Sequence, residues 1–260
     1  MSIIDAFDPE REAVINTWDF LTTNHRKLDA CIFNFSYKIM DALLEADLLE
    51  LVDDETLKCV STTFPVYVFK GTNIGVVKNY VGAPMTAGLL EDLSYAFSCS
   101  KIVLFGSCGG LDKTQTAGKL IVPTHAYRDE GMSYHYLPAA DYIEIKNHNV
   151  VSAVMDKLNI PYVKGRSWTT DAFLRETRRN MERRKAEGCI AVEMELSACQ
   201  AVADFRGVNF YAFLYSADNL DHDQWDEGIL SKIEMDERLT HFYIALEIAK
   251  YITNTEANHE

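Results

Sequence analysis

The stretch Cys189–Ala198, which reads CIAVEMELSA, decides how the whole chain is interpreted. It opens with four apolar or small residues, which predict a buried strand, and it then passes at once into a helical pattern. The strand ends in Glu193 and Glu195, and buried carboxylates are costly unless something pairs with them. Residues two apart on a strand point the same way, so one ligand can contact both glutamates. Adjacent hydroxyls of a furanose fit such a pair, and Met194 can cover the apolar face of the sugar.

The same two glutamates also have a purely structural interpretation. As residues of the first helical turn they would be solvated, and the helix dipole favours acids at that position. On this stretch alone both interpretations stay open.

Composition limits the classes of function. The chain has 260 residues, of which 48% are hydrophobic, and its formal net charge is −14. A nucleic-acid groove needs a basic stripe, so we expect no nucleic-acid partner. A few local donors can still hold one phosphate. No apolar run approaches the roughly 18 residues of a membrane span, so we expect no membrane partner either.

The cysteines indicate a reducing compartment. None of the six forms a CxxC pair or a Cys/His cluster with zinc spacing, so we expect no metal. Several lie in apolar runs, where a free cysteine behaves as a small hydrophobic residue. The N-terminus has acids where a signal peptide needs a basic region. These features predict reduced thiols and a cytoplasmic protein.

Strands and helices alternate along the chain. Apolar spacing predicts helices over 31–51, 85–98, 150–158, 175–186, 195–204 and 231–252, and β-rich runs predict strands over 65–69, 74–81, 101–105, 119–123, 162–168, 189–194 and 208–216. The segment 53–63 is expected to be a polar connection, and 126–136 is expected to be a loop or an irregular strand. This order predicts a single α/β domain over 1–260, with a mixed, mostly parallel central sheet flanked by helices. Residues 1–30 are expected to form a helical N-terminal arm.

A glycine-rich segment, GSCGG, follows the predicted central strand 101–105. Ligands in α/β folds bind beyond the carboxyl ends of the strands. Small residues at Gly106 and its neighbours let backbone N–H groups approach an anion, and Ser107 adds a hydroxyl. A tight structural turn is the alternative. Cys108 as a nucleophile would need a Cys/His arrangement that the sequence does not offer.

Two further segments lie at predicted strand ends. Asp218, in the segment SADN, is a candidate proton donor, because partial burial raises a carboxyl pKa towards neutrality. A turn or a cap is the alternative for Asp218. In WTTDAF, Trp168 and Phe173 offer rings on which a planar base can stack. Ordinary core aromatics beside an Asp171 helix cap are the alternative there.

Taken in order, these segments resemble the purine-nucleoside/uridine phosphorylase family. The resemblance runs from about Pro65 to about Leu220 and rests on five motifs: GSCGGL at 106–111, RDEGMSYHY at 128–136, TTDAF at 169–173, VEMEL at 192–196 and SAD at 216–218. RDEG and TTDAF look closer to the uridine branch, whereas Asp218 looks closer to the purine branch.

The resemblance assigns a role to each candidate residue. Glu195 would hold the ribose 2′- and 3′-hydroxyls, Met194 would pack on the sugar, and Glu193 would assist at the 2′-hydroxyl. Trp168 and Phe173 would line the base pocket, and Asp218 would protonate or hydrogen-bond the leaving base. Ser107 and the Gly106 backbone would contact phosphate, with Lys70 as a basic residue lent to a neighbouring subunit. The implied activity needs inorganic phosphate as co-substrate and no cofactor.

The sequence departs from the family pattern at the phosphate end. Leu104 stands where the phosphorylases usually carry an arginine, and the N-terminal glycine-aspartate-proline loop is replaced by IFNFSYKIMDALL at 32–44. Family members that lack these donors include nucleosidases, which use water in place of phosphate. The resemblance therefore implies a nucleoside phosphorylase that binds a purine or pyrimidine nucleoside and phosphate. A nucleosidase and a catalytically inactive nucleoside-binding protein are the alternatives. It also implies a homo-oligomer, either a dimer or a hexamer.

Overall fold

The strand predicted at 189–194 is present as β11 (Cys189–Glu193), and the helix that follows is α7 (Leu196–Arg206). A computed structural model describes residues 2–23, 25–52, 57–58, 62–221, 225–230 and 232–257. All of β11 is buried, as its apolar sequence predicts. The strand that ends in Glu193 therefore lies inside the molecule and not on its surface.

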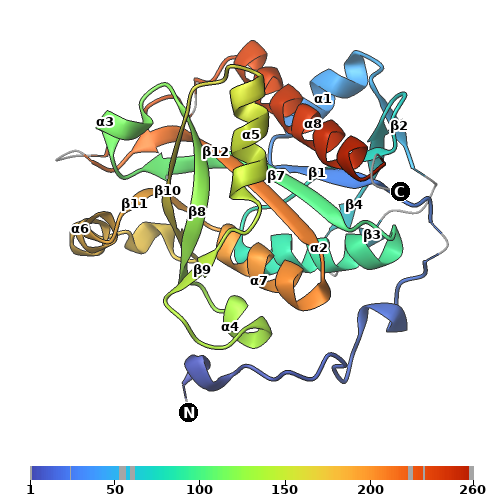
Figure 1. Cartoon of the computed structure of the whole chain (residues 1–260), viewed down its shortest axis with the longest axis horizontal. Coiled ribbons are helices and arrows are strands. Elements are labelled where there is room, and N and C mark those ends of the chain that lie inside the picture. The colour runs from blue at the N-terminus through green and yellow to red at the C-terminus, as the bar shows by residue number, and fades with distance from the viewer. Residues whose placement is uncertain are drawn as a thin grey trace.

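Ten strands of the described chain join in one mixed sheet, in the order β11-β10-β8-β12-β7-β1-β6-β5-β2, with β9 paired to β8 (Figure 1). The central pairs β12–β7, β7–β1 and β1–β6 are parallel, which confirms the predicted α/β class. The strands are β1 (Ala30–Asn34), β2 (Leu49–Leu51), β5 (Tyr67–Phe69), β6 (Ile74–Lys78), β7 (Lys101–Gly110), β8 (Leu120–Asp129), β9 (Tyr142–Glu144), β10 (Tyr162–Thr170) and β12 (Asn209–Asn219), and β3 (Leu57–Lys58) pairs with β4 (Thr63–Phe64) in a separate ribbon.

Helices cover both faces of this sheet (Figure 1). One apolar core includes α2 and α7, and the other includes α1, α5 and α8. The helices are α1 (Tyr37–Glu45), α2 (Ala83–Ala96), α3 (Lys113–Thr116), α4 (Ser133–Tyr136), α5 (His148–Lys157), α6 (Arg178–Ala186) and α8 (Met235–Ala257), with 3-10 turns η1 (Ile3–Asp5), η2 (Thr17–Asp19) and η3 (Phe173–Arg175). None of the helices described is long and apolar enough to cross a bilayer.

The sheet closes on itself at β7. Strand β11 pairs in parallel with β10 and also pairs antiparallel with β7. In the pairing with β7, Ala191 lies opposite Gly110 and Val192 lies opposite Gly109. The path β7-β12-β8-β10-β11 therefore returns to β7. This closure brings the carboxyl ends of β7, β11 and β12 to one place, although they are far apart in the sequence.

The glycine-rich segment is part of β7, which runs beyond the predicted strand 101–105, so the alternative of a tight turn is wrong. Strand pairing continues to Gly110 because the glycines leave room for side chains of the neighbouring strands. A Cβ on Gly109 would lie 2.7 Å from Leu220 Cδ1 and 2.9 Å from Val192 Cγ1. The glycines therefore allow β11 to pair closely with β7, which closes the sheet. Of this segment, only Ser107 is exposed.

The prediction of one helix over 31–51 is wrong at both ends, because α1 ends at Glu45 and Leu49–Leu51 form β2. Residues 30–34 form β1, whose five residues are all buried between β6 and β7, and α1 begins only after Ser36, whose Oγ accepts a hydrogen bond from Ile39 N. A strand that is covered on both faces is apolar throughout. The apolar run of β1 could therefore not be distinguished from the apolar positions of the helix that follows it. The predicted helices 175–186 and 231–252 begin later, at Arg178 and Met235.

Other connections also differ from prediction. The N-terminal arm is extended apart from η1 and η2, and it runs along the outside of α2, α4 and α7 (Figure 1). Most of 126–136 is regular, because β8 continues to Asp129 and α4 follows. Within the predicted connection 53–63, residues 53–56 and 59–61 lie outside the described residues.

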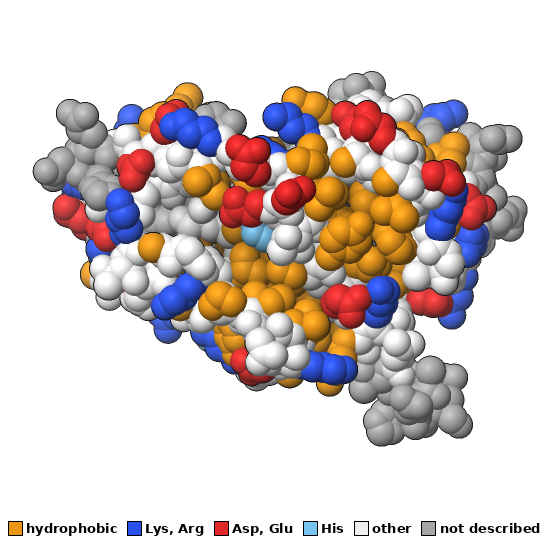
Figure 2. Space-filling model, turned by 90° about the horizontal axis from the view of Figure 1, so that it is seen from above, with side chains coloured by type: hydrophobic (Ala, Val, Ile, Leu, Met, Phe, Trp, Pro, Cys, Tyr) orange, Lys and Arg blue, Asp and Glu red, His pale blue; other side chains and the backbone are white. Residues whose placement is uncertain are grey.

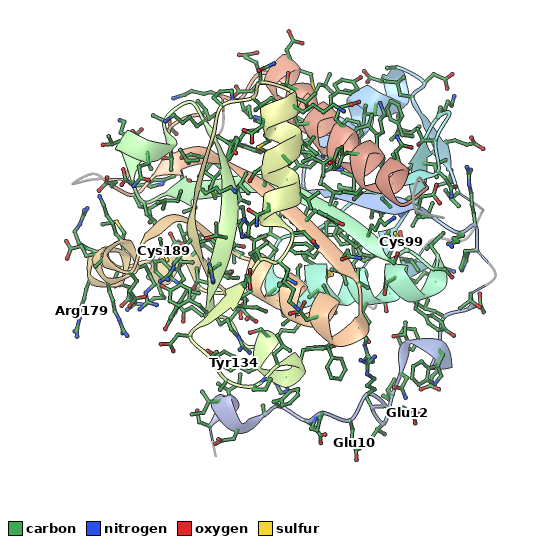
Figure 3. The ribbon with its side chains drawn as sticks, viewed as in Figure 1. Glu10, Glu12, Cys99, Tyr134, Arg179 and Cys189 are labelled. Carbon is green, nitrogen blue, oxygen red and sulfur yellow. The ribbon has the colours of Figure 1, made fainter. Side chains whose placement is uncertain are left out.

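Exposed apolar side chains are frequent on the side of the molecule that carries α1 and α8. Figure 2 shows hydrophobic side chains gathered on the face seen from above. The exposed large side chains of α1 and α8 are Tyr37, Leu44, Met235, Tyr243 and Tyr251. The five cysteines that the structure describes are all free and buried, and Figure 3 shows Cys99 and Cys189 well apart inside the ribbon.

The glycine crowding can be tested by adding one methyl group. Gly109→Ala should lower the free energy of unfolding by about 1–3 kcal/mol, because Leu220 and Val192 must move to make room. Urea unfolding measures this change. Gly88→Ala is the matched control, because its Cβ meets nothing within 4 Å and alanine favours the α2 helix. Equal stability of both variants would show that the closure does not depend on glycine.

Candidate active site

A cavity of about 330 Å³ lies where the ends of β7, β11 and β12 meet. It combines three of the predicted motifs, which supply Gly106, Ser107, Glu193, Met194, Glu195 and Asp218. The rest of its wall is mainly apolar and includes Phe35, Val81, Leu104, Val192 and Leu214. A mostly apolar cavity with a few convergent polar groups is the usual form of a small-molecule site.

Glu193 is held by hydrogen bonds on both carboxyl oxygens. Its Oε1 accepts from the hydroxyls of Ser167, at 3.2 Å, and Thr169, and its Oε2 accepts from the backbone N–H groups of Glu195 and Leu196, each at 2.7 Å. The side chain is 5% exposed. These hydrogen bonds join β10, the end of β11 and the beginning of α7. Glu193 therefore stabilises the turn that carries Glu195.

Glu195 is also buried, and it connects the end of β11 to the loop before α2, which is distant in the sequence. Its Oε1 accepts from Gly82 N at 2.7 Å and its Oε2 accepts from Met194 N at 3.3 Å. Gly82 has φ +114°, a conformation that L side chains rarely adopt, so glycine is required at this contact. Each Glu195 oxygen has one protein donor, which leaves acceptor capacity for a ligand.

Both carboxyls have raised pKa values. Burial raises the pKa of Glu193 to about 7, against the hydrogen bonds that lower it. Burial, followed by the nearby Glu193 charge, raises the pKa of Glu195 to about 8. The interpretation of these residues as solvated acids of the first turn is therefore wrong. A ligand that donates hydrogen bonds to Glu195 would stabilise its charged form.

Ser107 and Cys108 have different roles at the cavity. Ser107 is exposed and lines both this cavity and an adjoining one. Cys108 lies 3.5 Å from the Tyr215 carbonyl oxygen, to which its Sγ donates, and burial raises the pKa of this thiol well above its usual value. A neutral, hydrogen-bonded thiol is a poor nucleophile, which argues against nucleophilic catalysis by Cys108.

Asp218, on β12, lines the same cavity as the two glutamates. Its Oδ2 accepts from Trp225 Nε1 at 2.7 Å, and burial raises the pKa of its carboxyl. It also lines a second cavity of about 520 Å³ with Phe173, whose side chain is exposed. Sequence reasoning missed Trp225, because a single tryptophan in a loop carries no pattern.

Trp168 lies behind this second cavity. Its side chain is 2% exposed, packs with Leu111, Met181 and Val192, and donates from Nε1 to Asp129 at 2.9 Å. Within the described chain it lines neither of the two cavities. The structure thus places Phe173 at the candidate site and Trp168 in the core that supports it.

Sequence reasoning also missed Glu176, which lines both cavities beside Asp218. Burial, and then the Asp218 charge, raises the pKa of Glu176 to about 7. The residue lies between η3 and α6, in a stretch whose charges are otherwise typical of a solvated helix. No local sequence signal distinguishes it from its exposed neighbours.

An adjoining cavity of about 280 Å³ carries the basic residues of the site. It shares Gly106 and Ser107 with the first cavity, and its wall includes Lys38 and Arg238. Arg238 donates from Nε to the Ile233 carbonyl oxygen at 3.2 Å. Ser107, the predicted phosphate contact, lines the same cavity as these two cations.

Lys70 has a different position. It follows β5 at the far edge of the sheet and pairs with Asp47. It lines none of the three cavities described above. Its predicted role in a neighbouring subunit stays a prediction. Among the described residues, no group of three or more His, Cys, Asp or Glu side chains is arranged to hold a metal ion.

A profile of the Phosphorylase superfamily matches residues 40–245. The chain belongs to this superfamily. A DeoD-type purine nucleoside phosphorylase from Aliivibrio fischeri is 24% identical over 184 residues, which cover 70% of this chain and 74% of that protein. For a DeoD-type relative from Bacillus cereus the aligned part covers 66% of its length.

Solved structures of the superfamily share this fold. The purine nucleoside phosphorylase from Toxoplasma gondii in complex with immucillin-H has a TM-score of 0.70 at 16% identity, covering 95% of this chain and 98% of that one. The AMP nucleosidase from Bacteroides thetaiotaomicron has a TM-score of 0.69 at 17% identity, covering 89% and 91%. These likenesses concern the fold, and they include both a phosphorylase and a nucleosidase.

The raised pKa of Glu195 predicts a pH-dependent stability. Glu195 ionises near pH 4.5 when unfolded but near pH 8 when folded, so the folded state binds more protons between these values. The free energy of unfolding should therefore fall as pH rises from about 5 to about 8, by up to about 1.4 kcal/mol per pH unit from this group.

Glu195→Gln should remove this part of the slope, because the amide keeps an oxygen for Gly82 N–H but does not titrate. Urea unfolding of both proteins at a series of pH values measures the difference. Glu182→Gln, on the exposed face of α6, is the control and should leave the slope unchanged. Parallel curves for the native chain and Glu195→Gln would contradict the assignment.

Proposed function

We propose that the protein is a nucleoside phosphorylase, which cleaves the N-glycosidic bond of a nucleoside with phosphate and releases free base and ribose 1-phosphate. The observation that carries the proposal is one cavity with Glu195 and Met194 on one side and Asp218 on another, beside Ser107. Membership of the Phosphorylase superfamily supports it.

The sugar is assigned to Glu195. Two hydroxyls on adjacent carbons can donate to one carboxylate, and such charge-assisted hydrogen bonds are stronger than neutral ones. Met194 lies next to Glu195 in the cavity wall and offers an apolar surface to the furanose. Glu193 is assigned a positioning role, because both of its oxygens are already occupied by protein donors.

The base is assigned to the side of Asp218. When the C1′–N bond breaks, its electron pair moves to the base, and the sugar develops oxocarbenium character. A protonated Asp218 can give its proton to a ring nitrogen of the departing base, and its raised pKa favours the protonated form that this step needs. A phosphate oxygen then forms the new bond to C1′.

The phosphate is assigned to the cavity that Ser107 shares with Lys38 and Arg238. An anion next to C1′ stabilises the positive charge of the transition state and is itself the nucleophile. The two cations supply the positive charge that the missing family arginine would otherwise provide at Leu104. This observation favours phosphorolysis over hydrolysis.

A nucleosidase is the second candidate. It is favoured by Leu104, which is buried at 1% exposure and leaves an apolar surface in the cavity wall. In that case a water molecule would attack C1′ and the sugar product would be free ribose. A binding protein without turnover is the third candidate, but it would have no need of an acid at Asp218.

The proposal includes a homo-oligomer, either a dimer or a hexamer. The exposed apolar side chains of α1 and α8 support association between copies of the chain. They lie on a helical face, and a partner there would remove apolar surface from water.

Product analysis with and without phosphate tests the proposal. Base release from a panel of purine and pyrimidine nucleosides should require phosphate and should yield ribose 1-phosphate. Lys38→Ala should raise the phosphate concentration for half-maximal rate about tenfold, because one charge-assisted contact is lost. Lys58→Ala, an exposed lysine of β3, is the control and should change nothing.

Other outcomes would contradict phosphorolysis. Base release at full rate in phosphate-free buffer, with free ribose as product, would identify a nucleosidase. A thermal shift with nucleosides but no base release would identify a binding protein.

A further inference from the structure

Glu176 is a carboxyl at the junction of the first cavity, of about 330 Å³, and the second cavity, of about 520 Å³. It lines both of them, as Asp218 and Phe173 also do. Its side chain is partly buried, and no hydrogen bond or ion pair to its carboxylate occurs within the described residues. A polar group that is withdrawn from water and unpaired is costly, unless a ligand supplies the missing donor.

The surroundings of Glu176 are unusually apolar for a charged group. The second cavity is lined by Phe173, Leu174, Met181, Leu220, Trp225 and Leu230. The charged groups that share this cavity with Glu176 are Asp218 on β12 and Arg178 on α6. Burial and the Asp218 charge both raise the pKa of Glu176, and no hydrogen bond from a described residue opposes them.

We propose that Glu176 selects the base, and that the base is a purine whose six-membered ring carries an N–H donor. Such a donor is the amino group of a 6-aminopurine or the N1–H of a 6-oxopurine. This assignment rests on the proposed function, because it takes Asp218 as the group that faces the leaving base.

Asp218 gives the reason for a purine. An acid at this place needs a ring nitrogen with a free lone pair to receive its proton. A purine offers N7, whereas uracil has no such nitrogen once it is attached to ribose. The second cavity of about 520 Å³ continues beyond Asp218 and has room for the second ring.

Glu176 gives the reason for the N–H donor. A site built to hydrogen-bond a substrate N–H rejects an analogue that lacks it, because the polar group of the site is then left unpaired. The apolar side chains that line the second cavity strengthen this effect, because they offer no donor in place of the base. Sugar recognition at Glu195 would not discriminate between such bases.

The test compares kcat/KM for inosine and adenosine with that for purine riboside, whose base carries no N–H donor. The native chain should prefer the first two. In Glu176→Ala this preference should fall about 10- to 100-fold, since one hydrogen bond to a charged group is lost. The ratio between variants cancels the intrinsic difference between the leaving groups.

Two further variants complete the test. Glu176→Gln keeps an acceptor oxygen of the same size but no charge, so it should retain part of the preference. This variant also guards against misfolding of the alanine variant. Glu182→Ala, an exposed residue of α6, is the control and should retain all of it.

The outcomes separate this assignment from the proposed function. If the native chain releases no base from any nucleoside, the proposed function fails and the assignment falls with it. If it cleaves nucleosides but Glu176→Ala shows the native preference, only the assignment of Glu176 is wrong. If uridine is the best substrate, the purine class is wrong while the cleavage activity stands.

Discussion

The hydrogen bonds of the Glu193 carboxyl are the interaction on which the site depends. This buried group accepts from Ser167 and Thr169 of β10 and from the first backbone N–H groups of the turn into α7. A carboxyl that satisfies so many donors at once fixes the turn with little freedom. Glu195, two residues later, is thereby held at the end of β11 with acceptor capacity left over.

The second constraint is the closure of the sheet at β7. Because β11 pairs with Gly109 and Gly110 of β7, and β7 pairs with β12, the three strand ends form one rim. The cavity follows from this rim, since a ring of strands leaves a hollow at its carboxyl end. Groups that are more than a hundred residues apart in the sequence, such as Ser107 and Asp218, can therefore act on one ligand.

The electrostatics of the site follow from burial. Glu193, Glu195 and Glu176 all have raised pKa values, and desolvation is the largest cause for each. Perturbed carboxyls that cluster at a cavity are typical of functional sites. Lys38 and Arg238 line the adjoining cavity, which shares Ser107 with the cavity that these carboxyls line.

Local sequence patterns predicted part of this arrangement and could not predict the rest. The strand before Glu193 and the acid at Asp218 were predictable, because an apolar run that ends in a carboxyl is a local signal. The continuation of β7 through Gly110 was not, because it depends on side chains of β11 and β12. Glu176 and Lys38 become part of the site only through the tertiary fold, and Trp168 turns into the core because its side chain packs on Met181.

The most direct measurement is a crystal structure with a bound nucleoside. The account predicts that the ribose hydroxyls lie within hydrogen-bonding distance of the Glu195 carboxyl, with the sugar against Met194 and the base towards Asp218. A pentose bound elsewhere, for example in the large hollow that Lys113, Ile160 and His241 line between α3 and α8, would contradict it.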